Sequence, residues 1–385
     1  MKPRIAMIGL RGIPASDGGV EVAITELAPR LVALGADVTV YGRKGYLDDE
    51  KCTEYKGVHI KILPTINSKH LEAIAHTFLS TLHATFQGYD IIHYHALGNC
   101  LFAGIPRLFG KTTMATMHGL DWQRGKWGGF AKFVLRLGEL SAVYLASDAI
   151  AVSQKITNYV KDRYGKDIHF IPNGFSSTDA NNGMNSDVIE KNSLSKYVLF
   201  LGRLVPEKGI HLLIESFSKL DTDHQLVIAG RGTHTSRYVD QLKEMAAEDS
   251  RIIFTGGLYG ADKETAFNHA SVFVLPSTIE GMPIALLEAM SHGIPCVVSD
   301  IQENREVVET GQTRYAYVFE SENVNELGKT LSRVIENLDE AKSIAAEAKK
   351  YVYQTFSWDK IATETLAAYT ATLSGQSRLG NRNED

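Results

Sequence analysis

The sequence is poor in the features that mark several protein classes. It has three cysteines in 385 residues (Cys52, Cys100 and Cys296), and none stands in a C-x-x-C pair. This spacing argues against a disulfide framework or a zinc cluster and favours free, buried thiols. No apolar run approaches the roughly 18 residues of a membrane-spanning helix. The start, MKPRIAMIGL, lacks the apolar core and cleavage site of a signal peptide, so we expect a cytoplasmic protein.

A large excess of one charge is also missing, because the net charge is only −5. This balance argues against a general nucleic-acid binder. The average hides an asymmetry, since residues 1–175 carry 20 Lys and Arg against 15 Asp and Glu, and the remainder carries 20 against 30. An asymmetry between halves is typical of an interaction surface. We therefore expect the first half to face something anionic, such as a phospholipid surface.

The composition that is present, 44% apolar and 22% charged, is that of a globular protein. The length favours two or three domains. Apolar runs predict strands that alternate with helical spacing, which is typical of a parallel, doubly wound α/β sheet. In the first half these strands are expected at residues 4–9, 37–41, 90–94, 112–117, 148–152 and 169–172.

The alternation restarts after a polar stretch at 173–195, which has the composition of a linker. Further strands are expected at residues 197–201, 225–229, 251–254, 272–275 and 296–299. We therefore predict a first domain at 1–178, a second at 190–373, and a flexible tail at 374–385. Whether the final helix crosses back to the first domain is left open.

The strongest local motif is PSTIEGMPIALLEAM, residues 276–290. It follows a predicted strand and carries Glu280 and Gly281 in a loop, before a helix that begins near Pro283. Gly281 allows close backbone approach, and free amides at a helix start bind anions. Glu288 lies further along this helix inside an apolar run, which argues against a solvated surface residue. Two carboxylates around an amide cradle suit a ligand with hydroxyls and phosphates.

A second motif is LGRLVPEKG, residues 201–209. Arg203 and Lys208 follow the end of a strand, and Gly202 and Gly209 allow a tight path. Arginine presents a planar fork to phosphate oxygens, whereas lysine acts as a point charge. Alone, the motif fits a surface turn with two solvated cations equally well.

Together these motifs resemble the retaining glycosyltransferases of family 4, which have the GT-B fold of two Rossmann-like domains facing across a cleft. The resemblance covers nearly the whole chain and rests on the glycine-rich residues 12–19, Thr116–Gly119, Ile171–Gly174, residues 202–209, and Glu280 with Glu288. The opening GLRGIPA, followed by GGVE, is similar more narrowly to bacterial enzymes of surface-polysaccharide assembly, rhamnosyltransferases among them.

The resemblance implies a role for each matching residue. The implied catalytic residues are His118, Arg203, Lys208 and Glu280. Arg203 and Lys208 would hold the diphosphate of a nucleotide sugar and stabilise its charge as it leaves, which can replace a metal. His118 would lie near the reacting sugar, from the opposite domain.

The remaining implied contacts also concern the donor. Glu288 would bind ribose hydroxyls, and Glu280 with the backbone of Gly281, Met282, Pro283 and Ile284 would hold the donor sugar and diphosphate. Gly18 and Gly19 would bring a backbone loop against the donor or the acceptor. Many family members have Phe-Gly where this chain has Met282-Pro283, so the proline removes an amide donor and the donor sugar is less defined.

Two patterns suggest metals but do not support a metal site. Asp221-Thr222-Asp223 fits a D-x-D pattern, but polar neighbours predict a helix-to-strand loop there. His93 and His95 alternate along a strand, and no carboxylate spacing completes a metal site. We expect no metal and no cofactor beyond the nucleotide-sugar donor.

Residues 122–137 mix cations with aromatic side chains. Phe130, Phe133 and Leu137 share a predicted helical face, with Lys132 and Arg136 beside it. One interpretation is an interfacial helix that docks on an anionic membrane. The other is an ordinary helix that packs this apolar stripe on the sheet.

The sequence therefore predicts a metal-independent hexosyltransferase of cell-surface polysaccharide biosynthesis. It would move a hexose or deoxyhexose, with retention, from a UDP- or dTDP-linked donor to a lipid-linked or oligosaccharide acceptor, at the inner face of the membrane if residues 122–137 dock there. One alternative is an acceptor-independent nucleotide-sugar epimerase of the same fold. Another is a catalytically silent module that binds nucleotide sugar or membrane.

Overall fold

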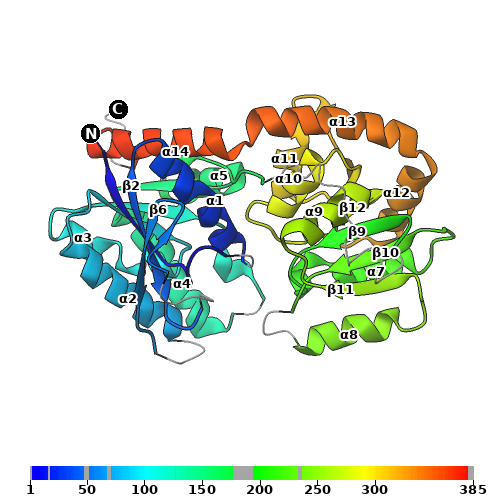
Figure 1. Ribbon diagram of the computed structural model, residues 1–385, viewed down its shortest axis with the longest axis horizontal. Helices are drawn as coiled ribbons and strands as arrows, with labels where there is room; N and C mark the ends of the chain where they lie inside the picture. The colour runs from blue at the N-terminus through cyan, green and yellow to red at the C-terminus, as the bar shows by residue number, and fades with distance from the viewer. Residues whose placement is uncertain are drawn as a thin grey trace. The chain divides into compact units, whose positions relative to one another are not determined.

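The computed structural model describes residues 2–15, 18–46, 52–66, 71–125, 127–176, 194–232 and 236–379 (Figure 1). The chain divides into two compact units. Unit 1 comprises Met1–Gly174 and Trp358–Asp385, and unit 2 comprises Phe175–Ser357. Most of the expected linker, at 177–193, lies outside the described residues.

Unit 1 is built on a sheet with the strand order β3-β4-β2-β1-β5-β6-β7-β8. Its neighbouring strands are parallel except for the antiparallel pair β3 and β4. Central strands are covered on both faces, so they are continuously apolar, as in the fully buried Ile5 to Ile8 of β1. The strands are β1 Arg4–Ile8, β2 Asp37–Arg43, β3 Glu54–Tyr55, β4 Val58–Leu63, β5 Ile91–His95, β6 Thr112–Met117, β7 Asp148–Ala151 and β8 His169–Phe170.

Helices cover both faces of this sheet (Figure 1). Helix α1 (Gly19–Ala33) packs beside α14 (Trp358–Leu373), which belongs to unit 1 although it ends the chain. The opposite face carries α2, α3 and α4 (Figure 1). The remaining helices of this unit are α2 Glu72–Thr85, η1 Asn99–Phe102, α3 Gly104–Arg107, η2 Asp121–Gln123, α4 Gly129–Tyr144 and α5 Gln154–Tyr164.

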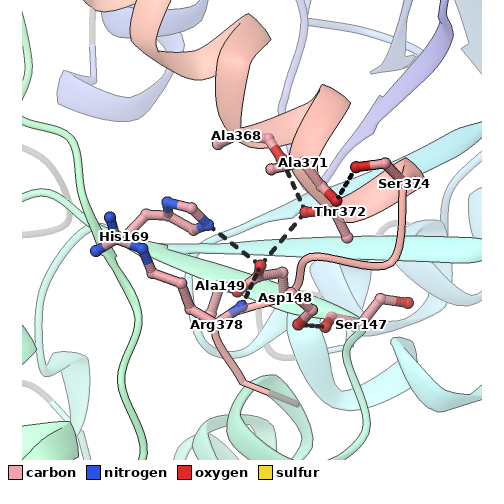
Figure 2. Close-up of polar contacts among 10 residues, drawn as sticks. Ser147, Asp148, Ala149, His169, Ala368, Ala371, Thr372, Ser374 and Arg378 are labelled. Atoms are coloured by element: carbon pink, nitrogen blue, oxygen red, sulfur yellow. Dashed lines mark hydrogen bonds and ion pairs between the residues drawn. The ribbon is translucent and has the colours of Figure 1, made fainter. Parts of the chain in front are cut away.

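A fully buried carboxylate joins the end of the chain to unit 1, as Figure 2 shows. Asp148, the first residue of β7, accepts hydrogen bonds from the amides of Ala149 (2.8 Å) and Arg378 (3.0 Å). It also accepts from Nε2 of His169 at 3.1 Å and from the hydroxyl of Thr372 at 3.4 Å. Burial alone would raise the pKa of Asp148, but these hydrogen bonds outweigh it and hold the pKa below its ordinary value.

Residues 374–379, which the composition assigned to a flexible tail, are also held by other contacts. The Ser377 hydroxyl donates to the carbonyl of Ser147 at 2.6 Å, and Lys166 Nζ donates to the carbonyl of Leu379 at 2.9 Å. The Leu379 side chain is buried. The ordered chain of unit 1 therefore extends past α14.

Unit 2 repeats the architecture with the strand order β11-β10-β9-β12-β13-β16, all parallel. Its strands are β9 Tyr197–Leu201, β10 Gln225–Ala229, β11 Ile252–Gly256, β12 Val272–Leu275, β13 Cys296–Ser299 and β16 Tyr317–Phe319, with a separate antiparallel pair, β14 Glu309–Thr310 and β15 Thr313–Arg314. In both units the carboxyl ends of parallel strands form one edge, where ligands of such sheets bind.

The helices of unit 2 pack in two groups. Helix α7 packs against α8 and α12, while α10 packs against α13. The helices are η3 Pro206–Lys208, α7 Ile210–Phe217, α8 Ser236–Ala246, α9 Gly260–His269, α10 Ile284–Ser291, α11 Gln302–Val308, α12 Val324–Glu336 and α13 Leu338–Thr355. Among the described residues, no helix has the length and apolarity needed to cross a bilayer.

The predicted fold class is confirmed: both units are Rossmann-like α/β sheets of parallel strands. The sequence did not predict β4 or β16. The three cysteines are free, but only Cys100 and Cys296 are buried; Cys52 is partly exposed, contrary to expectation.

Candidate active site

Two loops of unit 2 come together at the carboxyl ends of β9 and β12. Gly209 has a φ of 67°, in the left-handed region that favours glycine. A Cβ at this position would collide with the carbonyl oxygen of Pro276. The amide of Thr278 donates to the carbonyl of Glu207 at 2.9 Å. This close approach brings the charged side chains of the two loops together.

Lys208 and Glu280 form an ion pair between these loops. Lys208 Nζ lies 2.5 Å from Oε1 of Glu280, and the side chains are 14% and 9% exposed. The Ser277 hydroxyl donates to the same carboxylate oxygen at 2.7 Å. An ammonium group has three N–H donors, so Lys208 can keep this pair and still donate to a phosphate.

Arg203 lies in the same loop as Lys208, after the end of β9. The amide of Gly202 donates to the carbonyl of Ala229 at 3.0 Å, and a Cβ at Gly230 would collide with the carbonyl oxygen of Gly202. The backbone segments that follow β9 and β10 are therefore in close contact. Arg203, which is partly buried, is the residue after Gly202.

The expected amide cradle lies at the start of α10. Gly281, Met282 and Pro283 are buried, and the helix begins at Ile284. The amides of Leu286 and Leu287 already donate to the carbonyl of Pro283. Because the first amides of a helix have no partner inside it, the amides of Ile284 and Ala285 are the ones left at the helix start.

Glu288 is not a solvated surface residue, since only 4% of it is exposed. Its carboxylate pairs with Lys263 Nζ of α9 at 2.8 Å. Burial raises the pKa of Glu288, and Lys263 acts in the opposite direction. Sequence reasoning did not identify Lys263, because no local pattern links a lysine of α9 to a glutamate of α10.

In unit 1 the glycine-rich loop follows β1 and ends at α1. Gly9 has a φ of 104°, and a Cβ there would collide with Asn99 and with the carbonyl of His95. Gly18, with a φ of 88°, precedes α1, and a Cβ there would collide with the guanidinium of Arg11. Gly19 is exposed and has open space beside it, so its backbone is accessible.

His118 follows β6, is partly buried, and lies beside the buried His93 and His95. His118 Nε2 is 3.2 Å from Nδ1 of His95, and His95 stands 4.1 Å from His93, centroid to centroid. His93 bonds Thr116 Oγ1 at 2.7 Å and the Tyr369 hydroxyl of α14 at 2.6 Å. The histidines expected to lack a metal site therefore make hydrogen bonds to protein groups.

Burial keeps these imidazoles uncharged at neutral pH. It lowers the pKa of His118 to about 4, with Glu21 acting in the opposite direction, and the pKa of His93 to about 3. Burial also holds the pKa of His95 well below its ordinary value. Because Nε2 of His118 is engaged with His95, Nδ1 is the ring nitrogen that can bond a ligand, and a neutral imidazole suits a sugar hydroxyl better than a phosphate.

A small pocket of about 30 Å³ adjoins the cluster. His95, His118 and Trp358 contribute to its lining. Among the described residues, His95 Nε2 and Trp358 Nε1 are buried nitrogens without a hydrogen-bond partner. A water needs roughly 10–15 Å³, so this volume suits one or two waters and not a sugar.

The segment at 122–137 divides into an inner and an outer side; Lys126 lies outside the described residues. Trp122 points inward and donates to Glu139 at 2.6 Å. Phe130 and Phe133 of α4 are 79% and 57% exposed. The interpretation that this apolar stripe packs on the sheet is wrong, because α4 packs through Leu135, Gly138, Ala142 and their neighbours.

The D-x-D pattern lies in the loop between α7 and β10, as expected. Asp223 is exposed and pairs with Lys196 at 2.9 Å. Among the described residues, no group of three or more His, Cys, Asp or Glu side chains has the arrangement of a metal site.

Two family models match consecutive parts of the chain. The model for Glycosyltransferase Family 4 matches residues 17–178, and the model for Glycosyl transferases group 1 matches residues 184–351. With the fold described above, these matches define the class: the chain is a GT-B glycosyltransferase of the group 1 and family 4 type.

Individual relatives align over nearly the whole chain. An uncharacterized glycosyltransferase of Methanocaldococcus jannaschii is 27% identical over 95% of this chain and 97% of its own length. The α-maltose-1-phosphate synthase of Mycolicibacterium smegmatis is 25% identical over 95% of this chain and 98% of its own.

Solved structures share the fold. Sucrose-phosphate synthase from Thermosynechococcus elongatus superposes with a TM-score of 0.83 at 20% identity, covering 97% of this chain and 100% of that one. The HepE protein of Anabaena, in complex with UDP-glucose, gives a TM-score of 0.76 at 20% identity, covering 97% and 99%.

Proposed function

We propose that the protein is a retaining hexosyltransferase of cell-surface polysaccharide biosynthesis, in the rhamnosyltransferase-like branch. It moves a hexose or deoxyhexose from a nucleoside diphosphate sugar to a lipid-linked saccharide. The ion pair of Lys208 and Glu280, on the same sheet edge as the buried Glu288, is the observation that carries the proposal. HepE of Anabaena, a structural neighbour, is solved with UDP-glucose, which supports a nucleotide-sugar donor. UDP- and dTDP-linked donors both fit.

Unit 2 would bind the donor. Arg203 and Lys208 hold the diphosphate, and their fixed positive charge stabilises the negative charge that develops as the sugar leaves. Because two cations supply this charge, we propose that no metal is required. Glu280 and the backbone of Gly281 to Ile284 hold the donor sugar and diphosphate. Glu288 accepts hydrogen bonds from the ribose hydroxyls, and its ion pair with Lys263 holds the carboxylate in place.

Retention would follow from a front-side displacement. The bond from the anomeric carbon to the diphosphate breaks ahead of bond formation and leaves an ion pair. The acceptor hydroxyl attacks the same face, and the departing diphosphate oxygen takes its proton. Unit 1 contributes neutral His118, which donates to a hydroxyl of the sugar, while Gly18 and Gly19 present their backbone.

A panel of nucleoside diphosphates and their sugars in thermal-shift assays tests the donor site. A ligand present at 100 times its dissociation constant adds about 2.7 kcal/mol of stability. We expect a shift with UDP or dTDP that is lost in Glu288→Gln and kept in Glu215→Gln, an exposed glutamate of the same unit. No shift with any nucleotide would overturn the proposal, and sugar release without an acceptor would indicate an epimerase.

We also propose that α4 docks on the inner leaflet, where a lipid-linked acceptor lies. The outward side chains Phe130, Phe133 and Leu137 continue into Leu140, which is 40% exposed. Leu145, which follows the last residue of α4, lies against Gly104 of α3, and after α3 come Leu108 (85% exposed) and Phe109 (55% exposed). We call the exposed side chains of Leu108, Phe109, Phe130, Phe133, Leu137 and Leu140 the apolar face.

The segment that carries the apolar face has an excess of positive charge, which favours binding to an anionic membrane. Residues 97–147 contain six Lys and Arg (Arg107, Lys111, Arg124, Lys126, Lys132 and Arg136) but only two acids. Of these acids, Asp121 lies 3.5 Å from Arg124 and Glu139 is buried. Each basic residue near an anionic membrane adds about 1 kcal/mol of binding, and aromatic rings favour the headgroup region.

Co-sedimentation with vesicles tests this docking. We expect the wild-type protein to bind vesicles with 30% phosphatidylglycerol at least tenfold more tightly than phosphatidylcholine alone, at roughly 1 kcal/mol per basic residue. Phe130→Ser with Phe133→Ser, or Lys132→Glu with Arg136→Glu, should abolish the preference. The matched controls are Met245→Ser, and Lys243→Glu with Lys342→Glu, at exposed positions of unit 2. Equal binding to both vesicles would exclude the docking.

A further inference from the structure

Within the described part of unit 1, the buried cation Arg43 forms no ion pair. Arg43 is the last residue of β2, and only 9% of it is exposed. Among the residues that the structure describes, Nε of Arg43 has no hydrogen-bond partner, and its guanidinium lies in no ion pair. A buried charge without a partner is costly, so natural proteins rarely keep one without a function.

A second arginine lies beside it. The backbone amide of Arg43 donates to the carbonyl of Arg11 at 2.8 Å, which joins the two loops. The guanidinium carbons of both arginines lie 5.9 Å from the ring centroid of Tyr46. The two cations are therefore held around one aromatic ring.

The nearby carboxylates are engaged elsewhere. Glu21 pairs with Nε of Arg11 at 3.0 Å, and Glu72 accepts the hydroxyl of Tyr46 at 3.0 Å. Burial lowers the pKa of Arg43, and Arg11 adds to this effect, whereas Glu72, Tyr46 and Glu21 oppose it. The described carboxylates therefore do not fully balance the positive charge of the two arginines, and an anionic ligand would be attracted here.

The position of the pair agrees with a ligand site. Arg43 ends β2 and Arg11 follows β1, both at the carboxyl edge of the parallel sheet, where ligands of such folds bind. Glu21, the partner of Arg11, also acts electrostatically on His118, so the pair lies near the histidine assigned to the reacting sugar.

We propose that Arg43 and Arg11 form an anion site in unit 1 that binds the phosphate group of the acceptor. A planar guanidinium offers paired donors to phosphate oxygens. Arg43 supplies the charge that no described carboxylate pairs, and Arg11 supplies further N–H donors while it keeps its ion pair with Glu21. The acceptor then carries a phosphate next to the saccharide, as a lipid-linked saccharide or a sugar phosphate does. This identification of the acceptor rests on the proposed transferase function, whereas the anion site itself does not.

Calorimetric titration of the full-length protein with inorganic phosphate and with pyrophosphate tests the site. The titration is run in the Lys208→Ala background, so that the donor site of unit 2 contributes little. We expect Arg43→Met to weaken the binding of both anions at least tenfold. Arg163→Met, a fully exposed arginine of the same unit, should leave it unchanged. Equal anion binding in Arg43→Met and its parent would overturn the proposal.

Thermal unfolding in phosphate-free buffer separates a binding role from a structural one. Because the cation is uncompensated, Arg43→Met should melt at the same temperature as the parent or higher, and added phosphate should stabilise only the parent. A markedly lower melting temperature would show a structural arginine and also overturn the proposal. If Arg43→Met does not fold, Arg11→Gln tests the site in its place, and anion binding equal to that of the parent would overturn the proposal.

Competition experiments distinguish a lipid-linked acceptor from a sugar phosphate. The nucleotide panel separates the anion-site proposal from the transferase proposal. Vesicles that carry a lipid diphosphate should compete with pyrophosphate if the acceptor is lipid-linked, and glucose 6-phosphate should compete if it is a sugar phosphate. Competition by neither would limit the site to inorganic anions and overturn the acceptor assignment. Nucleotide binding should not depend on Arg43, so a failed donor panel with retained anion binding would remove the transferase proposal alone.

Discussion

The two units place different chemistry at the carboxyl edges of similar sheets. In unit 2, the buried charges are paired across loops and helices, Lys208 with Glu280 and Lys263 with Glu288. In unit 1 the same edge holds histidines that are neutral at pH 7 and the incompletely partnered Arg43. A paired charge stays fixed before its ligand arrives, which favours charge stabilisation without reorganisation. This difference is the basis of our proposal that unit 2 stabilises the leaving diphosphate and unit 1 positions hydroxyls.

The largest expected effect comes from removing Arg203 or Lys208, the cations of unit 2 proposed to stabilise the leaving diphosphate. We expect Arg203→Ala and Lys208→Ala each to lower kcat/KM on the order of 10²-fold, because removing one preorganised charge-stabilising donor costs that much. Lys219→Ala, an exposed lysine of the same unit, serves as the control and should keep full activity. Turnover within about threefold of the wild type in both variants would contradict the assignment.

A second test concerns Glu288, the carboxylate that unit 2 holds buried. Glu288→Gln should raise the KM for the nucleotide sugar roughly 10–100-fold, because hydrogen bonds to a charged group contribute about 1.5–3 kcal/mol. The change should fall mainly on KM rather than kcat, since the ribose is remote from the reacting carbon. A variant with an unchanged KM would place the ribose elsewhere.

Much of the fold followed from the sequence, for a physical reason. β6, β9, β10, β12 and β13 are largely buried runs of apolar and β-branched residues between loops, and their limits were predicted to the residue. The sequence did not reveal β4, because at the sheet's outer part Val58 and Ile60 alternate with exposed His59 and Lys61. It also did not reveal β16, which has only three residues.

Some site residues could be predicted from the sequence and others could not. The apolar run around Glu288 correctly suggested that this side chain is buried. Lys263 and Arg43 could not be found, because their importance comes from packing between elements distant in sequence. A lysine on a surface helix and an arginine at the end of a strand look ordinary until their neighbours are known.

Acid should destabilise unit 1 through its histidines. The pKa values of His93, His95 and His118 are lowered in the folded protein, so below the ordinary value near 6.5 the unfolded chain binds more protons. Each histidine then lowers the free energy of unfolding by up to about 1.4 kcal/mol per pH unit as pH falls from about 6.5 towards its folded pKa. Urea unfolding between pH 7 and 5 should show a shallower dependence for His95→Asn than for wild type.

His59→Asn is the matched control for this experiment, because His59 is 59% exposed. Its slope of stability against pH should equal that of the wild type. If His95→Asn showed the wild-type slope as well, folding would not change the proton affinity of His95, and the lowered pKa of this histidine would be wrong.

The smallest expected effect concerns Asp148, a buried charge of unit 1 that lies outside the edge compared above. Asp148 is a buried, ionised carboxylate of unit 1, but it lies at the amino end of β7, away from the ligand edge, and holds residues 374–379 (Figure 2). Asp148→Asn should lower the free energy of unfolding by about 1–3 kcal/mol, as for a lost charged hydrogen bond, and leave kcat/KM unchanged. Because its folded pKa is depressed, its contribution is present above the unfolded value near 4 and is lost as pH falls through the folded pKa. Asp162→Asn, at an exposed position of α5, is the control. A loss of activity without a loss of stability would show that the charge of unit 1 serves the reaction and not the anchoring of its last residues.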